Sequence, residues 1–255
     1  MTNTLDVRGL SKSFGGLEAV KNVHFTCHSG ETLGIIGPNG AGKTTVFNLI
    51  TGFIKPSRGQ ILFDGTDISG RRPSDICVQG IARTFQGIRL FKNMTVRENV
   101  WLAQNERARY LRAFPFLRRV DERAFSDEVD RILHDFHLQP KMNVMAGELA
   151  FGDMRRLEIC RALATRPRLL LLDEPASGLT PVETHQLLED LRRLKRTGLT
   201  IAIIEHDMHV ALGLSDKVVV LNFGQLLATG TPKEIRTDPR VIEAYLGTAA
   251  ETVDA

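Results

Sequence analysis

Residues 37–45 read GPNGAGKTT and contain the pattern G-x-x-x-x-G-K-[ST]. The apolar run 33–36 before them predicts a buried strand, and the stretch 43–50 predicts a helix. A glycine-rich turn between a strand and a helix lets backbone N–H groups converge on a phosphate, and the helix N-terminus adds positive potential. In such a turn Lys43 neutralises the β- and γ-phosphates and Thr44 ligates Mg²⁺. The stretch therefore predicts a phosphate-binding loop.

Later apolar runs place this loop in an α/β fold. Before the loop, residues 5–8 and 23–28 alternate apolar and polar side chains on either side of a Gly15-Gly16 turn, which predicts an antiparallel opening. After it, three runs are continuously apolar, as is typical of strands covered on both faces, and helical segments separate them. These runs are residues 169–172, 201–204 and 218–221. The sequence thus predicts a core with a mostly parallel sheet, preceded by an antiparallel β subdomain.

The apolar spacing becomes helical in the middle of the chain. Residues 95–98 and 180–183 both have the form of a capping box at a helix start. Residues 107–123 hold six arginines against two carboxylates, which indicates either a solvated face or attraction to an acidic partner or a lipid surface. We predict one domain made of a core, a helical subdomain and a flexible tail. The core takes residues 1–94 and 164–247, the helical subdomain 95–163 and the tail 248–255.

The composition excludes several classes of protein. The 33 Lys and Arg exceed the 30 Asp and Glu by a net charge of +3, far below what wrapping nucleic acid needs. No apolar run approaches the roughly 18 residues of a membrane span, and residues 1–8 do not resemble a secretory signal. Cys27, Cys77 and Cys160 are too far apart for a CxxC site and odd in number. We expect a cytoplasmic protein without a nucleic-acid partner.

Polar side chains follow two of the predicted core strands. Asp173 and Glu174 come after the first run, where Asp173 can meet Mg²⁺ and Glu174 can polarise an attacking water. His206 follows the next run, where an imidazole can touch a γ-phosphate. Taken alone, an acid or a histidine at the end of a strand is common. Together with Lys43 they form the candidate catalytic set.

In this order along the chain, the motifs resemble those of the nucleotide-binding subunit of ATP-binding cassette (ABC) transporters. The resemblance covers nearly the whole chain and implies a RecA-like P-loop NTPase core that binds ATP and Mg²⁺. It implies that Glu174 is the general base, that His206 is the switch histidine and that Phe14 stacks on adenine. It also implies that Gln86 senses Mg²⁺ and the membrane partner. By themselves, Phe14 is a core or turn aromatic and Gln86 a surface amide.

The resemblance assigns two sets of ligands. The residues implied to bind ATP are Phe14, Gly37, Pro38, Asn39, Gly40, Ala41, Gly42, Lys43, Thr44 and Thr45. The residues implied to hold Mg²⁺ are Thr44, Gln86 and Asp173.

The resemblance also makes residues 149–153 the signature loop that contacts ATP held by a second cassette chain. The loop departs from the usual Leu-Ser-Gly-Gly-Gln, and we expect Gly152 to open a helix over 153–164. The missing hydroxyl at the second place and the acid at the fifth both weaken contact with a phosphate. We therefore expect two unequal ATP sites in a heterodimer. The five residues are Leu149, Ala150, Phe151, Gly152 and Asp153.

Three further stretches are similar to the branch that serves branched-chain and other hydrophobic amino acids. They are residues 83–91, 155–163 and 238–247. In such importers two different ATP-binding chains lie peripherally at the cytoplasmic face of the inner membrane. They drive two membrane permeases, to which an extracytoplasmic binding protein delivers the amino acid. Residues 86–100 would receive a permease's coupling helix, although Phe91 and Met94 in this stretch also suit ordinary packing.

Other functions stay compatible with these residues. Importers of urea or amides and exporters of lipopolysaccharide share much of the pattern, and a homodimer is the alternative to the expected heterodimer. A soluble ABC ATPase of an assembly complex, for example in iron–sulfur cluster loading, has no membrane partner. A P-loop kinase or GTPase would use residues 37–44 for another chemistry, but it does not require the signature loop, the Asp173-Glu174 pair and His206 in this order.

Overall fold

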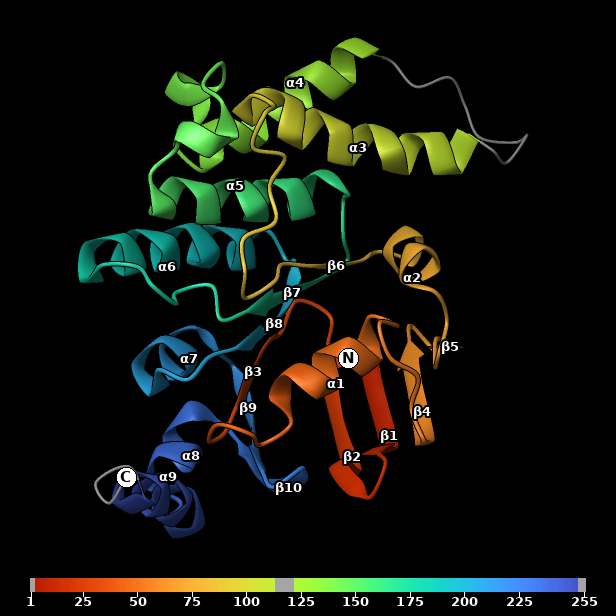
Figure 1. Ribbon diagram of the computed structural model, residues 1–255, viewed down its shortest axis with the longest axis vertical. Helices are drawn as coiled ribbons and strands as arrows, with labels where there is room; N and C mark the ends of the chain where they lie inside the picture. Colours follow the sequence, from red (N-terminus) through yellow and green to blue (C-terminus); the bar gives the residue numbers. More distant parts are fainter. Residues whose placement is uncertain (1–2, 113–121, 252–255) are drawn as a thin grey trace.

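The computed structural model describes the backbone of residues 3–112 and 122–251. Its larger sheet has the strand order β10-β9-β3-β8-β7-β6, and all neighbours pair in parallel except β10, which pairs antiparallel with β9 (Figure 1). The strands are β3 (Thr32–Ile36), β6 (Ile81–Arg83), β7 (Leu169–Asp173), β8 (Thr200–Ile204), β9 (Lys217–Asn222) and β10 (Gln225–Gly230). The predicted α/β fold with a mostly parallel sheet is confirmed.

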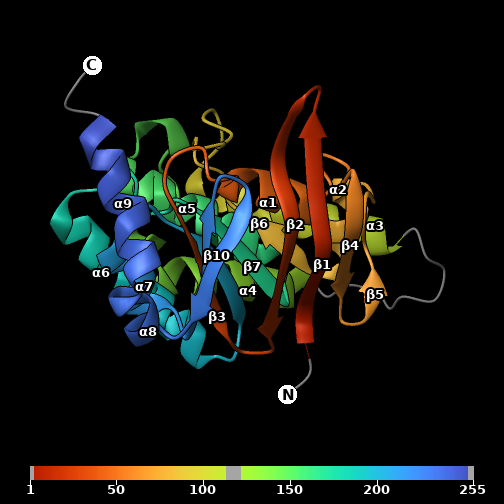
Figure 2. The same ribbon diagram turned by 90° about the horizontal axis from the view of Figure 1, so that it is seen from below.

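A second, four-stranded sheet is antiparallel and has the order β2-β1-β4-β5. Its strands are β1 (Asn3–Phe14), β2 (Leu17–His28), β4 (Arg58–Phe63) and β5 (Thr66–Asp67). The Gly15-Gly16 turn joins β1 to β2, as the alternation on its two sides predicted, and Figure 2 shows these two long strands side by side. The antiparallel opening is confirmed.

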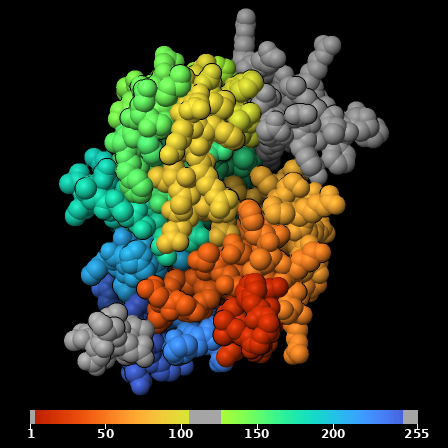
Figure 3. Space-filling view, viewed as in Figure 1, coloured from red at the N-terminus to blue at the C-terminus, as the bar shows by residue number. Residues whose placement is uncertain are grey.

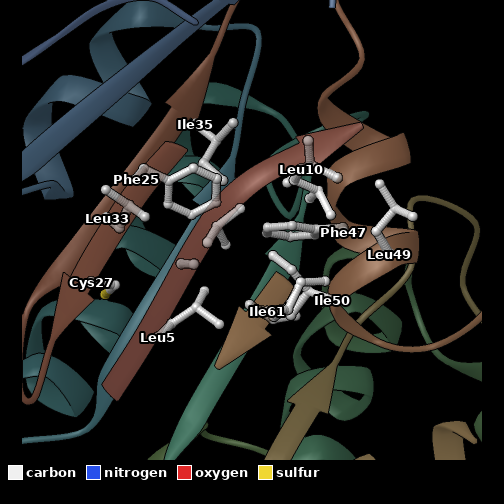
Figure 4. Close-up of a cluster of buried hydrophobic side chains, with 14 of the residues drawn as sticks. Leu5, Leu10, Phe25, Cys27, Leu33, Ile35, Phe47, Leu49, Ile50 and Ile61 are labelled. Carbon is white, nitrogen blue, oxygen red and sulfur yellow. The ribbon is translucent and has the colours of Figure 1, made fainter. Parts of the chain in front are cut away.

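Helix α1 (Lys43–Ile50) packs in a hydrophobic core that both sheets share. Phe47 of this helix is fully buried, and in Figure 4 it lies near Leu10 of β1 and Ile61 of β4. Ile35 of β3 belongs to the same core. Full burial of each such side chain contributes about 1.5–3 kcal/mol to folding. The strand before residues 37–42 and the helix after them are therefore both fixed, which sets the position of the loop.

The segment predicted to be helical contains α3 (Val96–Arg112), α4 (Glu122–Asp135) and α5 (Phe151–Ala164), with two short turns η1 (Gln139–Lys141) and η2 (Ala146–Glu148). A second core joins α3, α4 and α5 to α6 (Pro181–Arg196) and to the other face of the larger sheet. Figures 1 and 3 show this helical part at one end of the molecule and the N-terminal strands at the other. The side chains of the arginine-rich stretch 107–123 lie outside the described residues.

The remaining helices surround the larger sheet. They are α2 (Pro73–Gln79), α7 (Met208–Leu214), α8 (Pro232–Thr237) and α9 (Pro239–Glu251). Among the helices of residues 3–112 and 122–251, none has the length and apolarity that crossing a bilayer demands.

Two predicted boundaries are wrong. Helix α5 begins at Phe151, two residues before the predicted start, because Ala150 with extended backbone angles is already the N-cap. Helix α9 continues through Glu251, so residues 248–251 are helical although the prediction placed them in a flexible tail. Ala249 and Ala250 favour helix, and the helix continues past Gly247 although glycine disfavours it. Residues 252–255 lie outside the described part of the chain.

Candidate functional site

The loop between β3 and α1 requires glycine at two close approaches of the backbone. Gly37 has φ +152 and Gly42 has φ +95. A Cβ atom would lie 2.1 Å from the carbonyl oxygen of Leu221 at the first position and 2.7 Å from that of Ala19 at the second. Gly42 is the N-cap of α1 and gives it no side-chain cap, so the first N–H groups of the helix remain available to an outside acceptor.

The loop from Asn39 onward lines a cavity of about 240 Å³, whereas Gly37 and Pro38 are not among its walls. Its walls are Ala19, residues 39–45 and Glu174. All of the predicted loop residues from Asn39 to Thr45 therefore lie together at the cavity. Phe14 does not line this cavity; it is 48% exposed at the end of β1, with the ammonium of Lys12 5.0 Å from the centre of its ring.

Lys43 is buried inside the loop. Its Nζ donates hydrogen bonds to the carbonyl oxygens of Gly37 at 2.6 Å and Pro38 at 2.9 Å. Burial lowers the pKa of Lys43 below its ordinary value, while the carboxylates of Glu174 and Asp173 oppose this shift. The ammonium is thus held beside the cavity by carbonyl oxygens, and a phosphate oxygen in the cavity offers it a stronger, charged acceptor.

Asp173 ends β7 with a buried carboxylate. Its Oδ2 accepts a hydrogen bond from Arg83 Nη2 at 2.6 Å, and Arg83 Nη1 donates to Asn48 on α1 at 2.7 Å. The other oxygen, Oδ1, is buried and has no hydrogen-bond partner among the described residues. An orphaned carboxylate oxygen near the hydroxyl-bearing loop fits a Mg²⁺ ligand, since Mg²⁺ prefers oxygen donors. Asp173 and Thr44 would hold the ion.

Glu174 is the meeting point of three segments. It takes a left-handed backbone conformation with φ +48, and its N–H donates to the carbonyl oxygen of Ile204 at 2.9 Å. Its Oε2 accepts a hydrogen bond from Gln86 Nε2 at 2.9 Å and lies 3.9 Å from His206 Nδ1. The structure therefore brings Glu174, Gln86 and His206 together at the rim of the loop cavity. The Gln86 amide engages Glu174, whereas the prediction had it as a Mg²⁺ ligand, a role that stays untested.

The predicted signature loop lies away from this cavity, since none of residues 149–153 lines it. Leu149 is buried, whereas Ala150 is exposed and leaves the start of α5 without a side-chain cap. The ring of Phe151 is half exposed and lies against Gly178, where a Cβ atom would be 3.0 Å from the ring edge. Of these residues, Ala150 and Phe151 are exposed to solvent, away from the loop cavity.

Gly152 and Asp153 have structural partners that the sequence did not show. A Cβ atom on Gly152 would lie 2.5 Å from Glu183 Oε1, so glycine lets the start of α5 pack against the start of α6. The carboxylate of Asp153 pairs with the ammonium of Lys141 and lies 3.5 Å from Arg156 Nη1. The negative charge predicted to repel a phosphate is therefore paired with two cations of the same chain.

Sequence reasoning missed a buried ion pair that links α5 to the Gln86 segment. Arg155 donates hydrogen bonds to the carbonyl oxygens of Phe85 and Gln86, both at 2.9 Å, and to Glu158 Oε2 at 3.0 Å. The signal was an Arg and a Glu three places apart in a helix whose neighbouring positions are apolar. Arg155 thus ties α5 to the backbone that carries Gln86.

Comparison with known proteins identifies the family of this chain. The sequence model described as ABC transporter matches residues 20–177, more than half of the chain. The chain belongs to the ABC transporter family. A second model, described as branched-chain amino acid ATP-binding cassette transporter, matches residues 225–251 of the cassette.

Curated relatives match the cassette over almost its full length. It is 46% identical over 251 residues to the high-affinity branched-chain amino acid transport ATP-binding protein LivG of Escherichia coli (strain K12), covering 96% of this chain and 98% of that one. It is 45% identical over 251 residues to the high-affinity branched-chain amino acid transport ATP-binding protein BraF of Pseudomonas aeruginosa, with the same coverage of both chains.

Among solved structures, the cassette resembles an ATP-binding cassette of an ABC transporter in its ADP conformation. The TM-score is 0.85 at 33% sequence identity, and the match covers 97% of this chain and 100% of that one. The predicted P-loop NTPase fold is thereby confirmed, and the chain is an ATP-binding cassette of a family of ATPases.

Proposed function

We propose that this cassette hydrolyses ATP to drive import of branched-chain or other hydrophobic amino acids through partner membrane permeases. The convergence of Gln86 and His206 on Glu174 at the rim of the loop cavity carries the proposal. The names of two relatives state branched-chain amino acid transport, which supports these amino acids as the cargo. The chain then works at the cytoplasmic face of the membrane, beside the permeases.

In the proposed reaction each loop residue has a distinct task. Lys43 neutralises the β- and γ-phosphates of ATP, and the N–H groups at the start of α1 bind their oxygens. Mg²⁺, when bound by Thr44 and Asp173, adds positive charge at the phosphates. Glu174 accepts the proton of the attacking water, and the amide of Gln86 orients its carboxylate. His206 contacts the γ-phosphate.

Two cassette chains complete each other's sites in this proposal. The uncapped start of α5 meets the ATP of the partner cassette, in a heterodimer or a homodimer. Because Lys141 and Arg156 pair with Asp153, the repulsion that this acid exerts on a phosphate is reduced but the flexible amide of the usual signature is still absent. We therefore place the slower of two unequal sites at this signature loop.

A second cavity is the proposed docking site for the permease. It has a volume of about 370 Å³ between α2, β6, α3 and α5. Phe85, Arg89 and Arg161 line it, and the guanidinium of Arg161 stacks over the half-exposed ring of Phe91, 5.0 Å from its centre. Phe85 lines this cavity and directly precedes Gln86, so a permease helix bound there contacts the segment that Arg155 ties to α5.

The test begins with affinity purification of the tagged chain from detergent-solubilised membranes. We expect two permease-like proteins and a second cassette to co-purify, and the complex in proteoliposomes to couple ATP hydrolysis to uptake of leucine, isoleucine or valine. Uptake of urea or an amide instead would show that the cargo is not a branched-chain amino acid. A soluble complex without membrane proteins would favour the assembly ATPase and reject the transporter.

The hydrolytic role is tested by Glu174→Gln in the same complex. Replacing the carboxylate of Glu174 by an amide removes the general base but leaves the phosphate-binding loop intact. ATP affinity should therefore stay within about twofold of wild type, while turnover falls by a factor of about 10²–10⁴. Asp130→Asn, a surface change in a pair with Arg97 on the helical part, is the matched control. Wild-type turnover in Glu174→Gln would remove this residue from the mechanism.

A further inference from the structure

Glu205 is a buried acid next to the proposed catalytic centre that the mechanism above does not use. It follows the last residue of β8 and directly precedes His206, and its side chain is 0% exposed, whereas that of His206 is 57% exposed. Burying a carboxyl group is costly unless it is hydrogen-bonded or neutral. The position of Glu205 therefore calls for an explanation.

The two oxygens of Glu205 have different surroundings. Oε1 accepts a hydrogen bond from the N–H of Ala176 at 2.9 Å, in the loop that follows Glu174. Oε2 is buried without a hydrogen-bond partner among the described residues and lies 3.9 Å from His206 Nδ1. Nδ1 is also 3.9 Å from Glu174 Oε2. One oxygen thus fixes the carboxyl group, and the other is left next to an imidazole nitrogen.

Several titratable groups act on Glu205. Burial raises its pKa from the ordinary 4.5 to about 7; the N–H of Ala176 and the imidazole of His206 oppose this, and the carboxylates of Glu174 and Asp207 add to it. The same residue lines a cavity of about 540 Å³. The other titratable side chains that line it are His185, His206, Asp207 and His209. Burial therefore favours the protonated carboxyl group relative to an exposed glutamate.

We propose that Glu205 is a positioning residue that shares one proton with His206 and thereby keeps the Nε2–H of the imidazole available to the γ-phosphate. The proposal rests on the proposed function, in which His206 contacts that phosphate. It needs Oε2 and Nδ1 to approach from 3.9 Å to hydrogen-bond distance when nucleotide binds.

The shared proton has two positions with the same consequence. In one, Oε2–H donates to Nδ1, and the neutral imidazole carries its own proton on Nε2. In the other, the O–H bond of Glu205 breaks, the proton forms an N–H bond at Nδ1, and the imidazolium donates to the carboxylate. Nε2–H is a donor in both. Only when the pair loses its proton does the imidazole proton settle on Nδ1, and Nε2 then presents a lone pair that repels a phosphate oxygen.

The sign of the pH dependence follows from this balance. The pair loses its proton as pH rises through about 7, the value to which burial raises the pKa of Glu205. Turnover should therefore fall on the alkaline side. A glutamine in this place can still accept from Ala176 and always donates to Nδ1 with its amide, so it mimics the protonated carboxyl group at every pH.

The experiment measures ATPase of the assembled complex between about pH 6 and about pH 9, each variant normalised to its own maximum. We expect wild-type turnover to fall at least about fivefold above pH 7, and Glu205→Gln to fall by less than about twofold. Glu205→Leu should lower kcat about tenfold with KM for ATP within about twofold. Glu189→Gln, an exposed acid paired with Arg192 on α6, should keep the wild-type profile.

A second readout does not depend on hydrolysis. In the histidine-¹⁵N-labelled chain with Mg²⁺ and a non-hydrolysable ATP analogue, the resonance of His206, assigned with His206→Asn, reports which ring nitrogen is protonated. We expect wild type to move to the Nδ1–H tautomer above about pH 8 and Glu205→Gln to stay Nε2–H. Identical pH profiles and tautomers in both proteins would overturn the role of Glu205. A complex that hydrolyses no ATP would overturn the proposed function, and the tautomer measurement would still decide on Glu205.

Discussion

The starts of four helices differ in how their first N–H groups are satisfied. The side chains of Thr180 in α6 and Thr231 in α8 each accept a hydrogen bond from the backbone N–H three residues on. The side chains of Glu183 and Glu234 accept a hydrogen bond from the backbone N–H of that threonine, so both helix starts have a complete capping box. The starts of α1 and α5 follow Gly42 and Ala150 and have no side-chain cap. The closed starts serve folding. Of these four, the open starts are those of the phosphate loop and the predicted signature loop, where we propose that an outside anion takes the place of a cap.

The largest expected effect tests the open start of α1. Lys43→Ala removes the ammonium beside the uncapped N–H groups, so we expect ATP affinity to fall by about 10²-fold or more, because a charge-assisted contact to the phosphates is lost. Binding of a fluorescent ATP analogue to the isolated chain measures it. The thermal midpoint without nucleotide serves as the control for folding. Unchanged affinity would mean that Lys43 makes no contact with the phosphates.

A cap introduced at α5 should close the second open start. Ala150→Asp supplies an acceptor for the first N–H groups and adds a charge that repels a phosphate, so we expect about 0.5–1 kcal/mol more stability but a fall of about tenfold or more in ATPase of the complex. Ala150→Ser is the matched control, since it caps without charge. Stability is followed by urea unfolding. Higher ATPase in Ala150→Asp would contradict the role given to this helix start.

Opening a closed start should affect only folding. Thr231→Ala breaks the capping box of α8, so we expect a loss of about 1 kcal/mol in the free energy of unfolding, about a fivefold change in the folding equilibrium. Affinity for ATP should stay the same within error, because α8 does not line the loop cavity. Urea unfolding and nucleotide titration of the same preparation give both numbers. Weaker ATP binding by the fully folded variant would contradict the distinction between capped and uncapped helix starts.

The smallest effect is expected from Asp153→Gln, which gives the signature loop its usual fifth residue. Lys141 and Arg156 already pair with the acid, so ATPase of the heterodimer should rise only about two- to threefold. The reverse change in the partner cassette should lower it by a similar factor. If neither change alters turnover, the two sites are equal and the hypothesis of a slower site is rejected.

Local patterns predicted the elements of this fold well. The apolar run 33–36 and the stretch 43–50 became β3 and α1, and the box at Thr180 is present with both of its hydrogen bonds. Periodicity and capping are properties of adjacent residues, so a sequence shows them directly. The two errors, at the start of α5 and the end of α9, are boundaries, which depend on a few tenths of a kcal/mol per residue.

The site was predicted less completely, because much of it joins distant segments. Arg83 lies 90 residues before Asp173, and it meets this acid only because β6 pairs with β7. Burial of Glu205 and the hold of Arg155 on the Gln86 segment likewise depend on sheet order and helix packing. The chemistry of Lys43 could be derived from its motif. The roles given to Phe14 and Gln86 came from the resemblance alone and stay predictions.

The order of strands in the larger sheet bears on how the protein is made. Strand β3 lies between β8 and β9, where Leu33 is in register with Ala202 and Lys217, and the N–H of Gly224 donates to the carbonyl oxygen of Ala41 in the loop. A ribosome releases β3 well before β8 and β9, so β3 has neither of its neighbours in the sheet until those later strands have emerged. We therefore expect a growing chain to bind ATP only after β9 has been released.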